Sequence, residues 1–285
     1  MTSILSWNIQ CGTGVDGKND LGRIASVIRA MADVDIICLQ EVSRFNADLD
    51  GGHDDDQAAI MASLFPDHHP IFGAAFDRDG GIDEPRRQFG NMILSRLPVV
   101  QIFNHPLPQP IPEEPCKHMP RQALEIIVAE SGMPFRLTTT HLEYHSANQR
   151  MAQVSRLRDI QAEIIANRSY GDHAPKSGPY AAVARPTRSL VCGDFNSEPD
   201  DPVYALMSSV ISGSDDAYKD AWRTVHGSAR HAPTCGIYDH RQWPEGPHCR
   251  DFFFASGDLS KLISRVEVDE QTAASDHQPV LLVLD

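Results

Sequence analysis

Residues 190–197 constrain the fold of this chain more than any other short stretch, because an apolar run there ends in a glycine followed by two spaced polar groups. Side chains alternate between the faces of a strand, so Asp194 and Asn196 are expected to point the same way. Gly193 permits close approach of backbone or ligand, and Pro199 ends the strand pattern. A carboxylate beside a carboxamide suits activation of a water and binding of an anion. An Asx-turn that closes a core strand is the structural alternative.

The composition is that of an ordinary globular chain, with 41% hydrophobic and 22% charged residues among 285. We expect one domain over residues 1–285 with a substantial core. The formal net charge of −14 argues against sequence-independent duplex binding through a broad basic surface. A nuclease is still compatible with this charge, because divalent cations and a local Arg cluster reverse the field inside a cleft.

The start of the chain and its cysteines point to the cytoplasm. Residues 1–7 lack the basic segment and long apolar core of a signal peptide, and no apolar run reaches membrane-spanning length. Cys38 and Cys192 lie in apolar, strand-like runs, where Cys acts as a small hydrophobic residue. We therefore expect free thiols, a cytoplasmic location and no stable membrane insertion. No feature of the sequence indicates an oligomeric state.

A glycine-rich loop after the first predicted strand offers a different function. Residues 12–17 match GxGxxG, and Glu41 lies close to where a dinucleotide site requires an acidic residue. The stretch from Gly12 to Lys18 also matches GxxxxGK, although Asn19 stands where a P-loop requires Ser or Thr. A nucleotide-binding protein that uses this loop is therefore an alternative, and a plain loop is the simpler interpretation.

Apolar periodicity and turn residues predict the remaining elements. Residues 123–129 and 135–140, separated by a Gly- and Pro-containing turn, predict a hairpin. The Pro-rich segment 104–120, with His105 and His118, is predicted to be a loop that rims a cleft. Residues 45–57, 77–88 and 170–186 are also predicted to be loops. The predicted helices are 21–31, 58–65 and 147–166, and the other predicted strands are 3–9, 34–39, 90–96, 250–255, 262–268 and 279–284.

Polar residues mark the ends of several predicted strands. An acid at the end of a buried strand is costly unless it is paired or binds a metal. Glu41 is such an acid, and a salt bridge to Arg44 is its structural interpretation. Beside Asn8, Glu41 is instead a candidate ligand for Mg²⁺, which takes few protein oxygens. The marked positions are Asn8, Glu41, His141, Asp194, Asn196, Asp251, Asp276 and His277, with Asn91 at the start of a strand.

A zinc site in the His-rich segment 226–249 is a further alternative. Its candidate ligands are Cys235, His240, His248 and Cys249. This set contains neither the CxxC nor the HxxxH spacing that is typical of such sites.

Together these strand-end residues resemble the endonuclease/exonuclease/phosphatase superfamily, the DNase I-like metal-dependent phosphoesterases. The resemblance extends from Trp7-Asn8 to Ser275-Asp276-His277, and its most specific parts are Leu39-Gln40-Glu41, Gly193-Asp194-Phe195-Asn196 and Ser275-Asp276-His277. It implies a four-layered α/β sandwich of two packed, mostly antiparallel sheets flanked by helices. The active site would lie at one end, where the strand termini meet.

The resemblance also implies a metal site and a general base. Asn8 and Glu41 would ligate Mg²⁺ or Mn²⁺, with Asp276 nearby. Asp194 would orient and deprotonate the attacking water. These roles fit an in-line displacement at phosphorus, which requires an aligned water and neutralised oxygens.

The remaining residues of the set are implied to bind the phosphoryl group. Asn196 and His141 would hold its oxygens, and Asn91 would line the pocket. Asp251 would pair with His277, fix its orientation and favour its protonated form.

Two departures bear on the branch of the family. The abasic-site repair branch carries an Asp where this chain has Gln10, and a Tyr-containing segment where this chain reads Thr140-His141-Leu142-Glu143. We therefore expect a phosphodiesterase or phosphatase acting on a small or single-stranded substrate. A DNA endonuclease or exonuclease of the same superfamily is the alternative.

Overall fold

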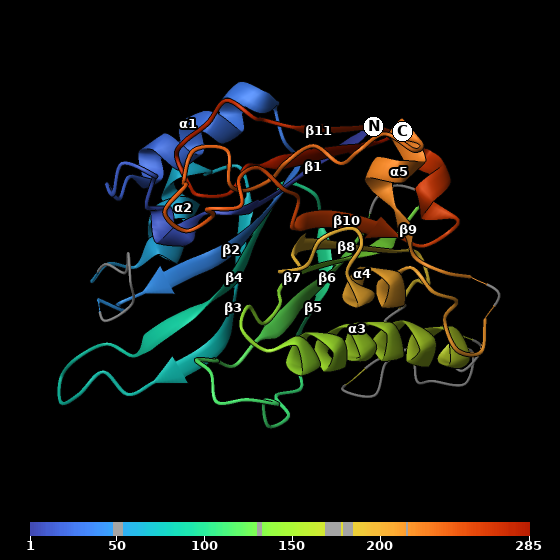
Figure 1. The fold of residues 1–285 in the computed structure, drawn as a ribbon, viewed down its shortest axis with the longest axis horizontal. Helices are drawn as coiled ribbons and strands as arrows, with labels where there is room; N and C mark the ends of the chain where they lie inside the picture. The colour runs from blue at the N-terminus through green and yellow to red at the C-terminus, as the bar shows by residue number, and fades with distance from the viewer. Residues whose placement is uncertain (48–53, 130–132, 169–177, 179–184, 215) are drawn as a thin grey trace.

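Two six-stranded β-sheets pack face to face in the computed structural model, and helices cover their outer faces (Figure 1). The structure describes residues 1–47, 54–129, 133–168, 178, 185–214 and 216–285. The layers follow the order helix, sheet, sheet, helix, which confirms the predicted four-layered sandwich. The two termini lie side by side because the first strand pairs antiparallel with the last.

The first sheet contains both ends of the chain, and its outer face is covered by α1 (Leu21–Met31) and α2 (Gln57–Leu64). Neighbouring strands are antiparallel except for β1 and β2, which run parallel. From edge to edge its strands are β11 (Ile263–Val268), β12 (Val280–Leu284), β1 (Thr2–Asn8), β2 (Ile36–Arg44), β4 (Arg87–Ser95) and β3 (His69–Arg78).

The second sheet has the same design, with β7 and β8 as its parallel pair. Its outer face packs against α3 (Ala147–Asn167) and α4 (Pro202–Met207), while α5 (Ala221–His226) lies at the end beside β10 and β11. From edge to edge its strands are β5 (Val99–Pro106), β6 (Gln122–Val128), β7 (Phe135–His141), β8 (Ser189–Asp194), β10 (Asp251–Ala255) and β9 (Lys219–Asp220). Two short 3-10 helices, η1 (Gln10–Gly12) and η3 (Leu259–Leu262), complete the elements used below.

Alternating side chains along the central strands divide the core into layers. In β1, Ile4 packs between the sheets, whereas Leu5 and Trp7 pack beneath the helices of the first sheet. In β8, Cys192 faces the first sheet and Val191 packs toward α3 and α4. Both faces of these strands are therefore buried, which explains why they read as continuous apolar runs.

The predicted elements are largely confirmed, and α1 has the predicted bounds. The hairpin is β6 and β7, and the long helix is α3. The loop prediction for 104–120 was wrong at its start, because residues 104–106 belong to β5. The loop prediction for 77–88 was wrong at both ends, because β3 runs through residue 78 and β4 begins at 87. The predicted loop at 45–57 falls in part, and the linker at 170–186 mainly, outside the described residues.

The topology brings four strand ends to one end of the sandwich. The parallel pair β1 and β2 and the parallel pair β7 and β8 all end there, and β10 begins there, since Asp251 lies opposite Asp194 in the antiparallel register. Polar side chains at these ends therefore meet. In the described part of the chain, no helix is both long and apolar enough to cross a membrane.

Candidate active site

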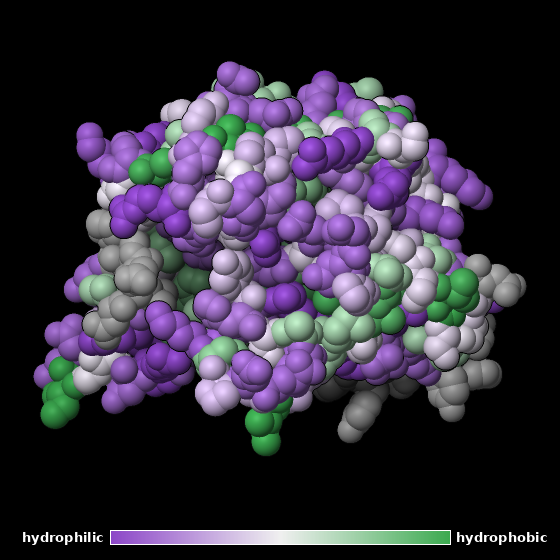
Figure 2. Space-filling model, viewed as in Figure 1, coloured by the Kyte–Doolittle hydropathy of each residue, from purple (hydrophilic) through white to green (hydrophobic). Residues whose placement is uncertain are grey.

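A cavity of about 480 Å³ opens at this end of the sandwich. Its inner wall contains strand-end residues predicted from the sequence, and its outer wall comes from loops. The face in Figure 2 is mostly hydrophilic, with hydrophobic residues in small, scattered groups. The lining residues are Cys11, Glu41, Phe89, Lys117, His118, Met119, Arg121, His141, Glu143, Tyr144, His145, Asp194, Asn196, Gln242, Trp243, Asp276 and His277.

Asp194 is the last residue of β8, and the residue before it is a glycine that no other residue can replace without rearrangement. Gly193 has φ +130°, and a Cβ atom there would lie 1.9 Å from the carbonyl oxygen of Thr140. Asp194 Oδ1 accepts the backbone N–H of Asn196 at 2.8 Å, which is the Asx-turn of the structural interpretation. Its Oδ2 accepts from the Asn8 amide at 3.0 Å. One carboxylate oxygen thus closes the turn while the other faces the site.

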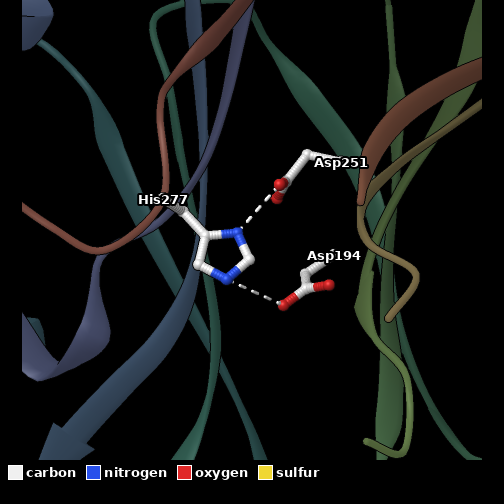
Figure 3. A group of neighbouring side chains, drawn as sticks. All are labelled: Asp194, Asp251 and His277. Carbon is white, nitrogen blue, oxygen red and sulfur yellow. Dashed lines mark hydrogen bonds and ion pairs between the residues drawn. The ribbon is translucent and has the colours of Figure 1, made fainter. Parts of the chain in front are cut away.

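His277 lies between two buried carboxylates (Figure 3). Its Nδ1 is 2.8 Å from Asp251 Oδ2, and its Nε2 is 3.6 Å from Asp194 Oδ2. Burial alone would lower the pKa of His277, but Asp251, Asp194 and Asp276 raise it well above its ordinary value. The imidazole is therefore held as a cation, with its orientation fixed by Asp251.

The two carboxylates beside His277 differ in their environment. Burial raises the pKa of Asp251 to about 6 despite the opposing effect of His277. Burial would also raise the pKa of Asp194, but His277 and His141 lower it below its usual value. Asp194 therefore stays ionised to a lower pH than Asp251, and it lines the cavity, whereas Asp251 does not.

Glu41 enters the cavity through a bulge in β2. The register with β4 shifts between Leu39 and Val42, and Glu41 itself has φ +56°. The salt bridge to Arg44 does not form, because Arg44 pairs with Asp56 at 2.6 Å. The bulge thus directs an acidic side chain from the end of a buried strand into the site.

Glu41 and Asp276 form a pair of carboxylates that fits a divalent cation. Burial, followed by the charge of Asp276, raises the pKa of Glu41 to about 7, and burial likewise raises the pKa of Asp276. Among the described residues, no Lys or Arg lies within 4.0 Å of either carboxylate. Glu41 is partly exposed to the cavity and Asp276 is buried, and two carboxylates without a Lys or Arg partner are oxygen donors of the kind that Mg²⁺ or Mn²⁺ prefers.

Asn8 links the two groups of carboxylates. Its Nδ2 donates to Glu41 Oε1 and to Asp194 Oδ2, each at 3.0 Å, while its Oδ1 accepts the Gln10 N–H at 3.1 Å. In this arrangement the amide nitrogen, rather than the oxygen, faces the proposed metal ligands. The Asn8 side chain thus lies between the carboxylates of Glu41 and Asp194 and donates a hydrogen bond to each.

His141 and Asn196 form a second polar pair. Asn196 Nδ2 donates to His141 Nε2 at 3.0 Å and to the Leu142 carbonyl oxygen at 2.9 Å. An amide nitrogen only donates, so the proton of the neutral imidazole lies on Nδ1. Burial lowers the pKa of His141 to about 3, which keeps the ring neutral. Its Nδ1–H is buried without a partner, and the nearest carboxylate oxygen, on Glu41, is 3.8 Å away.

Asn91 does not reach this cavity. It lies in the middle of β4 and donates to the carbonyl oxygen of Gln122 at 3.3 Å. It is 3% exposed and is not among the lining residues.

The zinc set is only partly assembled. Cys235 Sγ lies 3.2 Å from His248 Nε2, but Cys249 Sγ donates to the Asp251 carbonyl oxygen and His240 is not part of the cluster. His248 Nε2 already accepts from Arg250 Nε at 2.7 Å. These side chains are therefore engaged in interactions within the protein, and Trp243 of the same segment contacts both His248 and His277.

The glycine-rich loop is closed by its own side chains. Arg23 pairs with Asp16 at 3.0 Å and donates to the Lys18 carbonyl oxygen. Asp20 caps α1 by accepting the Arg23 N–H. The helix N-terminus that a nucleotide phosphate would use is thus occupied by a carboxylate.

Several lining residues carry no strand-end signal and were not predicted. Glu143 accepts from Arg121 Nε at 3.3 Å and from the His145 N–H at 2.9 Å. Arg121 Nη1 and the Trp243 indole N–H are buried without hydrogen-bond partners. The only available signal for Arg121 was that a basic residue directly precedes a predicted strand.

The prediction that residues 104–120 form the rim of the cleft is confirmed, because Lys117, His118 and Met119 line the cavity.

A two-sheet sandwich with carboxylates, carboxamides and imidazoles at its central strand ends is the architecture of the DNase I-like class. The family model described as "Endonuclease/Exonuclease/phosphatase family" matches residues 5–277. The chain therefore belongs to this family, whose members are hydrolases that act on phosphoesters. None of the curated proteins compared with the chain matches it.

Solved structures share the fold over the whole chain. An endonuclease/exonuclease/phosphatase from Beutenbergia cavernae is 26% identical with a TM-score of 0.69, covering 99% of this chain and 71% of that one. The mannosyl-6-phosphatase Bt3783 of Bacteroides thetaiotaomicron is 17% identical with a TM-score of 0.64, covering 100% of both chains. Truncated Caenorhabditis elegans TDP2 is 23% identical with a TM-score of 0.63, covering 99% of this chain and 96% of that one.

Proposed function

We propose that this protein is a divalent-metal-dependent hydrolase that cleaves a phosphodiester or phosphomonoester by in-line attack of a water. The observation that carries the proposal is the buried Asp251–His277–Asp194 arrangement, with distances of 2.8 and 3.6 Å, at the wall of a polar cavity. In this arrangement Asp194, as a general base, and His277, as a cation of fixed orientation, would both face the phosphoryl group that is attacked.

Asp194 is the proposed base. Its Oδ1 is held by the Asx-turn, and its Oδ2 is oriented by the Asn8 amide toward the cavity. A carboxylate with a lowered pKa stays ionised and can accept a proton from a water aligned with phosphorus.

His277 and His141 are the proposed phosphoryl-binding groups. His277 supplies a cation whose Nε2–H faces the reacting centre, and Asp251 holds it in that orientation. His141 supplies the unpartnered Nδ1–H described above, and Asn196 fixes its tautomer.

Glu41 and Asp276 would hold the metal. Asn8 lies between Glu41 and the proposed base, Asp194, and donates a hydrogen bond to each. A bound Mg²⁺ or Mn²⁺ would neutralise charge on the phosphoryl and leaving oxygens. We propose that the substrate is small or single-stranded, because loops wall the cavity to about 480 Å³. We place the reaction in the cytoplasm, since all six cysteines are free thiols.

The test is metal-dependent turnover on a substrate panel. The panel contains bis-p-nitrophenyl phosphate, p-nitrophenyl phosphate, single-stranded DNA, duplex DNA, RNA and sphingomyelin, each with and without Mg²⁺ or Mn²⁺. We expect Asp194→Ala and His277→Ala to lose more than about 10³-fold in rate. Asp159→Ala, on the exposed side of α3, is the matched control and is expected to retain full activity.

The nucleotide-binding alternative predicts a different result. It requires NAD or ATP to bind without hydrolysis and to bind equally well to Asp194→Ala. Metal-dependent turnover that survives Asp194→Ala unchanged would contradict the proposed mechanism.

A further inference from the structure

The outer wall of the cavity collects cationic and donor groups in a chain whose net charge is −14. Lys117, His118 and Arg121 all line it, and all come from the segment between β5 and β6. The catalytic carboxylates lie at the inner end of the same cavity. The cavity therefore contains cationic and donor groups from this segment in addition to the carboxylates of the proposed metal site.

Arg121 is fixed in this wall while leaving one nitrogen free. Glu143 Oε2 accepts from Arg121 Nε at 3.3 Å and from the Met119 N–H at 3.4 Å. Its Oε1 accepts from the His145 N–H at 2.9 Å. The Arg121 side chain is only 7% exposed, yet its Nη1 has no acceptor among the described residues. A buried guanidinium nitrogen without an acceptor is costly, so a ligand oxygen is the group it lacks.

His118 presents a second donor. Gln109 Nε2 lies 2.7 Å from His118 Nδ1, and Gln149 Nε2 lies 3.4 Å from the same atom. Because amide nitrogens only donate, Nδ1 accepts and the proton of the neutral ring lies on Nε2. This Nε2–H has no partner within the described part of the chain.

Lys117 supplies an exposed positive charge among the residues that line the cavity. It is exposed, and no carboxylate of the described residues pairs with it. Glu143, the carboxylate that lines the cavity beside Arg121, already accepts the three bonds given above. Lys117 therefore keeps its charge for a ligand.

We infer that this wall is a second anion-binding subsite, so that the substrate carries a phosphate or similar anion besides the scissile phosphoryl group. The inference rests on the proposed function and narrows its substrate class. It favours a phosphoester of the nucleoside bisphosphate or single-strand type over one whose other end is neutral or cationic. Charge-assisted hydrogen bonds from three donors would give this second anion both affinity and position.

The test compares two esters that differ by one phosphate. The 5′-p-nitrophenyl ester of thymidine 5′-monophosphate and the same ester with a 3′-phosphate both release p-nitrophenol on hydrolysis. We expect kcat/KM to be about 10-fold higher for the 3′-phosphorylated ester. Lys117→Gln is expected to lower this ratio severalfold, and Lys117→Arg to restore it. Lys261→Gln, an exposed lysine on η3 outside the cavity, is the matched control and should leave the ratio unchanged.

The outcomes separate the two proposals. Absence of metal-dependent release from both esters would contradict the proposed function. Release from both esters at equal kcat/KM, with a ratio that Lys117→Gln does not move, would overturn the second subsite alone. Calorimetric binding of thymidine 5′-monophosphate and thymidine 3′,5′-bisphosphate provides a test that does not depend on turnover, and equal Kd values would also overturn the subsite.

Competition by single-stranded dT8 identifies the source of the second anion. Tighter binding of dT8 than of the bisphosphate would assign the subsite to a neighbouring backbone phosphate. Binding of the bisphosphate without competition by dT8 would assign it to a second phosphate on a small molecule.

Discussion

Glu41 and Asn196 share a backbone conformation that residues other than glycine rarely adopt, with φ values of +56° and +48°. Glu41 lies at the bulge in β2, and Asn196 lies two residues after the end of β8. Asn adopts this conformation more readily than most residues other than glycine, whereas Glu has no such preference, and the conformation is strained at both positions. The strain is maintained by partners on other elements, namely Asn8 for Glu41 and His141 for Asn196. The site is thus held by interactions rather than by local preference.

The Trp243 side chain is expected to act through its indole N–H. Its ring lies edge-on to His277, with centroids 5.8 Å apart, and Arg250 lies 4.7 Å from the ring centroid. The Trp243 N–H has no acceptor within hydrogen-bond distance among the described residues, yet it lies close enough to Asp276 to oppose the rise in the pKa of Asp276 that burial causes. Trp243→Phe keeps a ring in place but removes the donor. We therefore expect kcat/KM to fall about 10-fold with little change in the unfolding midpoint, as measured by steady-state kinetics and denaturant titration.

Trp222 offers a matched control for this change. Its indole N–H is also buried without a partner, but it lies on α5 and stacks on His231, 6.0 Å away between centroids. Trp222→Phe is expected to leave kcat/KM unchanged. Equal effects of the two substitutions would show that Trp243 acts only through packing.

At the residue scale, the sequence predicted site residues that follow apolar strands. A charged residue at the end of a buried strand costs free energy unless it is paired or binds a ligand, and this makes such a residue a candidate for the site. Glu41 and Asp194 were found in this way, whereas His277 was found because it lies just before the last predicted strand. Arg121 and Trp243 could not be, because they lie in segments without periodicity. Their positions depend on tertiary contacts such as the one from Arg121 to Glu143.

At the scale of elements, the strands missed from the sequence are β3, β5 and β9, and all three lie at sheet edges. Central strands are buried on both faces and read as apolar runs, whereas edge strands are half exposed. β5 alternates between partly buried and exposed positions along its length. The short helices α4 and α5, six residues each, are too brief to show helical periodicity.

A buried charge cluster is expected to stabilise the second sheet. Glu125 of β6 lies 2.8 Å from Arg136 of β7, 2.8 Å from Arg185 and 3.7 Å from His105. Burial alone would raise the pKa of Glu125, but His105 and the two arginines lower it to about 2. A carboxylate with a lowered pKa in the folded state contributes stability above its unfolded value. That contribution, about 3 kcal/mol, is lost as the pH falls from about 5 toward 2.

The corresponding variant is Glu125→Gln, measured by urea unfolding between pH 7 and pH 3. We expect a loss of about 3 kcal/mol at pH 7, because Arg136 is left buried without its charge partner, and a flatter pH dependence. Glu163→Gln removes an exposed pair with Arg156 at 2.7 Å and should cost less than about 1 kcal/mol. A pH dependence that is as steep in Glu125→Gln as in the wild type would contradict this assignment.

At the scale of the whole molecule, the site connects the two sheets at the end of the sandwich where the ends of β1, β2, β7 and β8 meet. Asn8 and Glu41 come from the first sheet, whereas Asp194 and Asp251 come from the second. Hydrogen bonds cross between the sheets from Asn8 to Asp194 and from His277 to Asp251. Several carboxylates therefore lie close together at this end, and their mutual repulsion destabilises the folded protein. The arrangement required for catalysis thus lowers the free energy of unfolding.

A divalent cation is expected to remove that cost and raise the thermal stability of the whole protein. The free energy gained is RT ln(1 + [Mg²⁺]/Kd), which is about 2.7 kcal/mol at 100 times Kd and corresponds to about 5 °C in Tm. In Glu41→Gln, one of the two mutually repelling carboxylates of the cavity is replaced by a neutral amide. We therefore expect this variant to have a higher Tm than the wild type without metal and a smaller rise with Mg²⁺.

Calorimetric Tm values with EDTA and with increasing Mg²⁺ provide the measurement, and they require no substrate. Glu270→Gln removes an exposed carboxylate away from the cavity and should match the wild type in both conditions. If Glu41→Gln had a lower Tm in EDTA and kept the full rise with Mg²⁺, then Glu41 would be a structural acid and the cation would bind elsewhere. A smaller rise combined with a higher Tm in EDTA would identify the repulsion between Glu41 and Asp276 as the reason this end of the sandwich requires a metal.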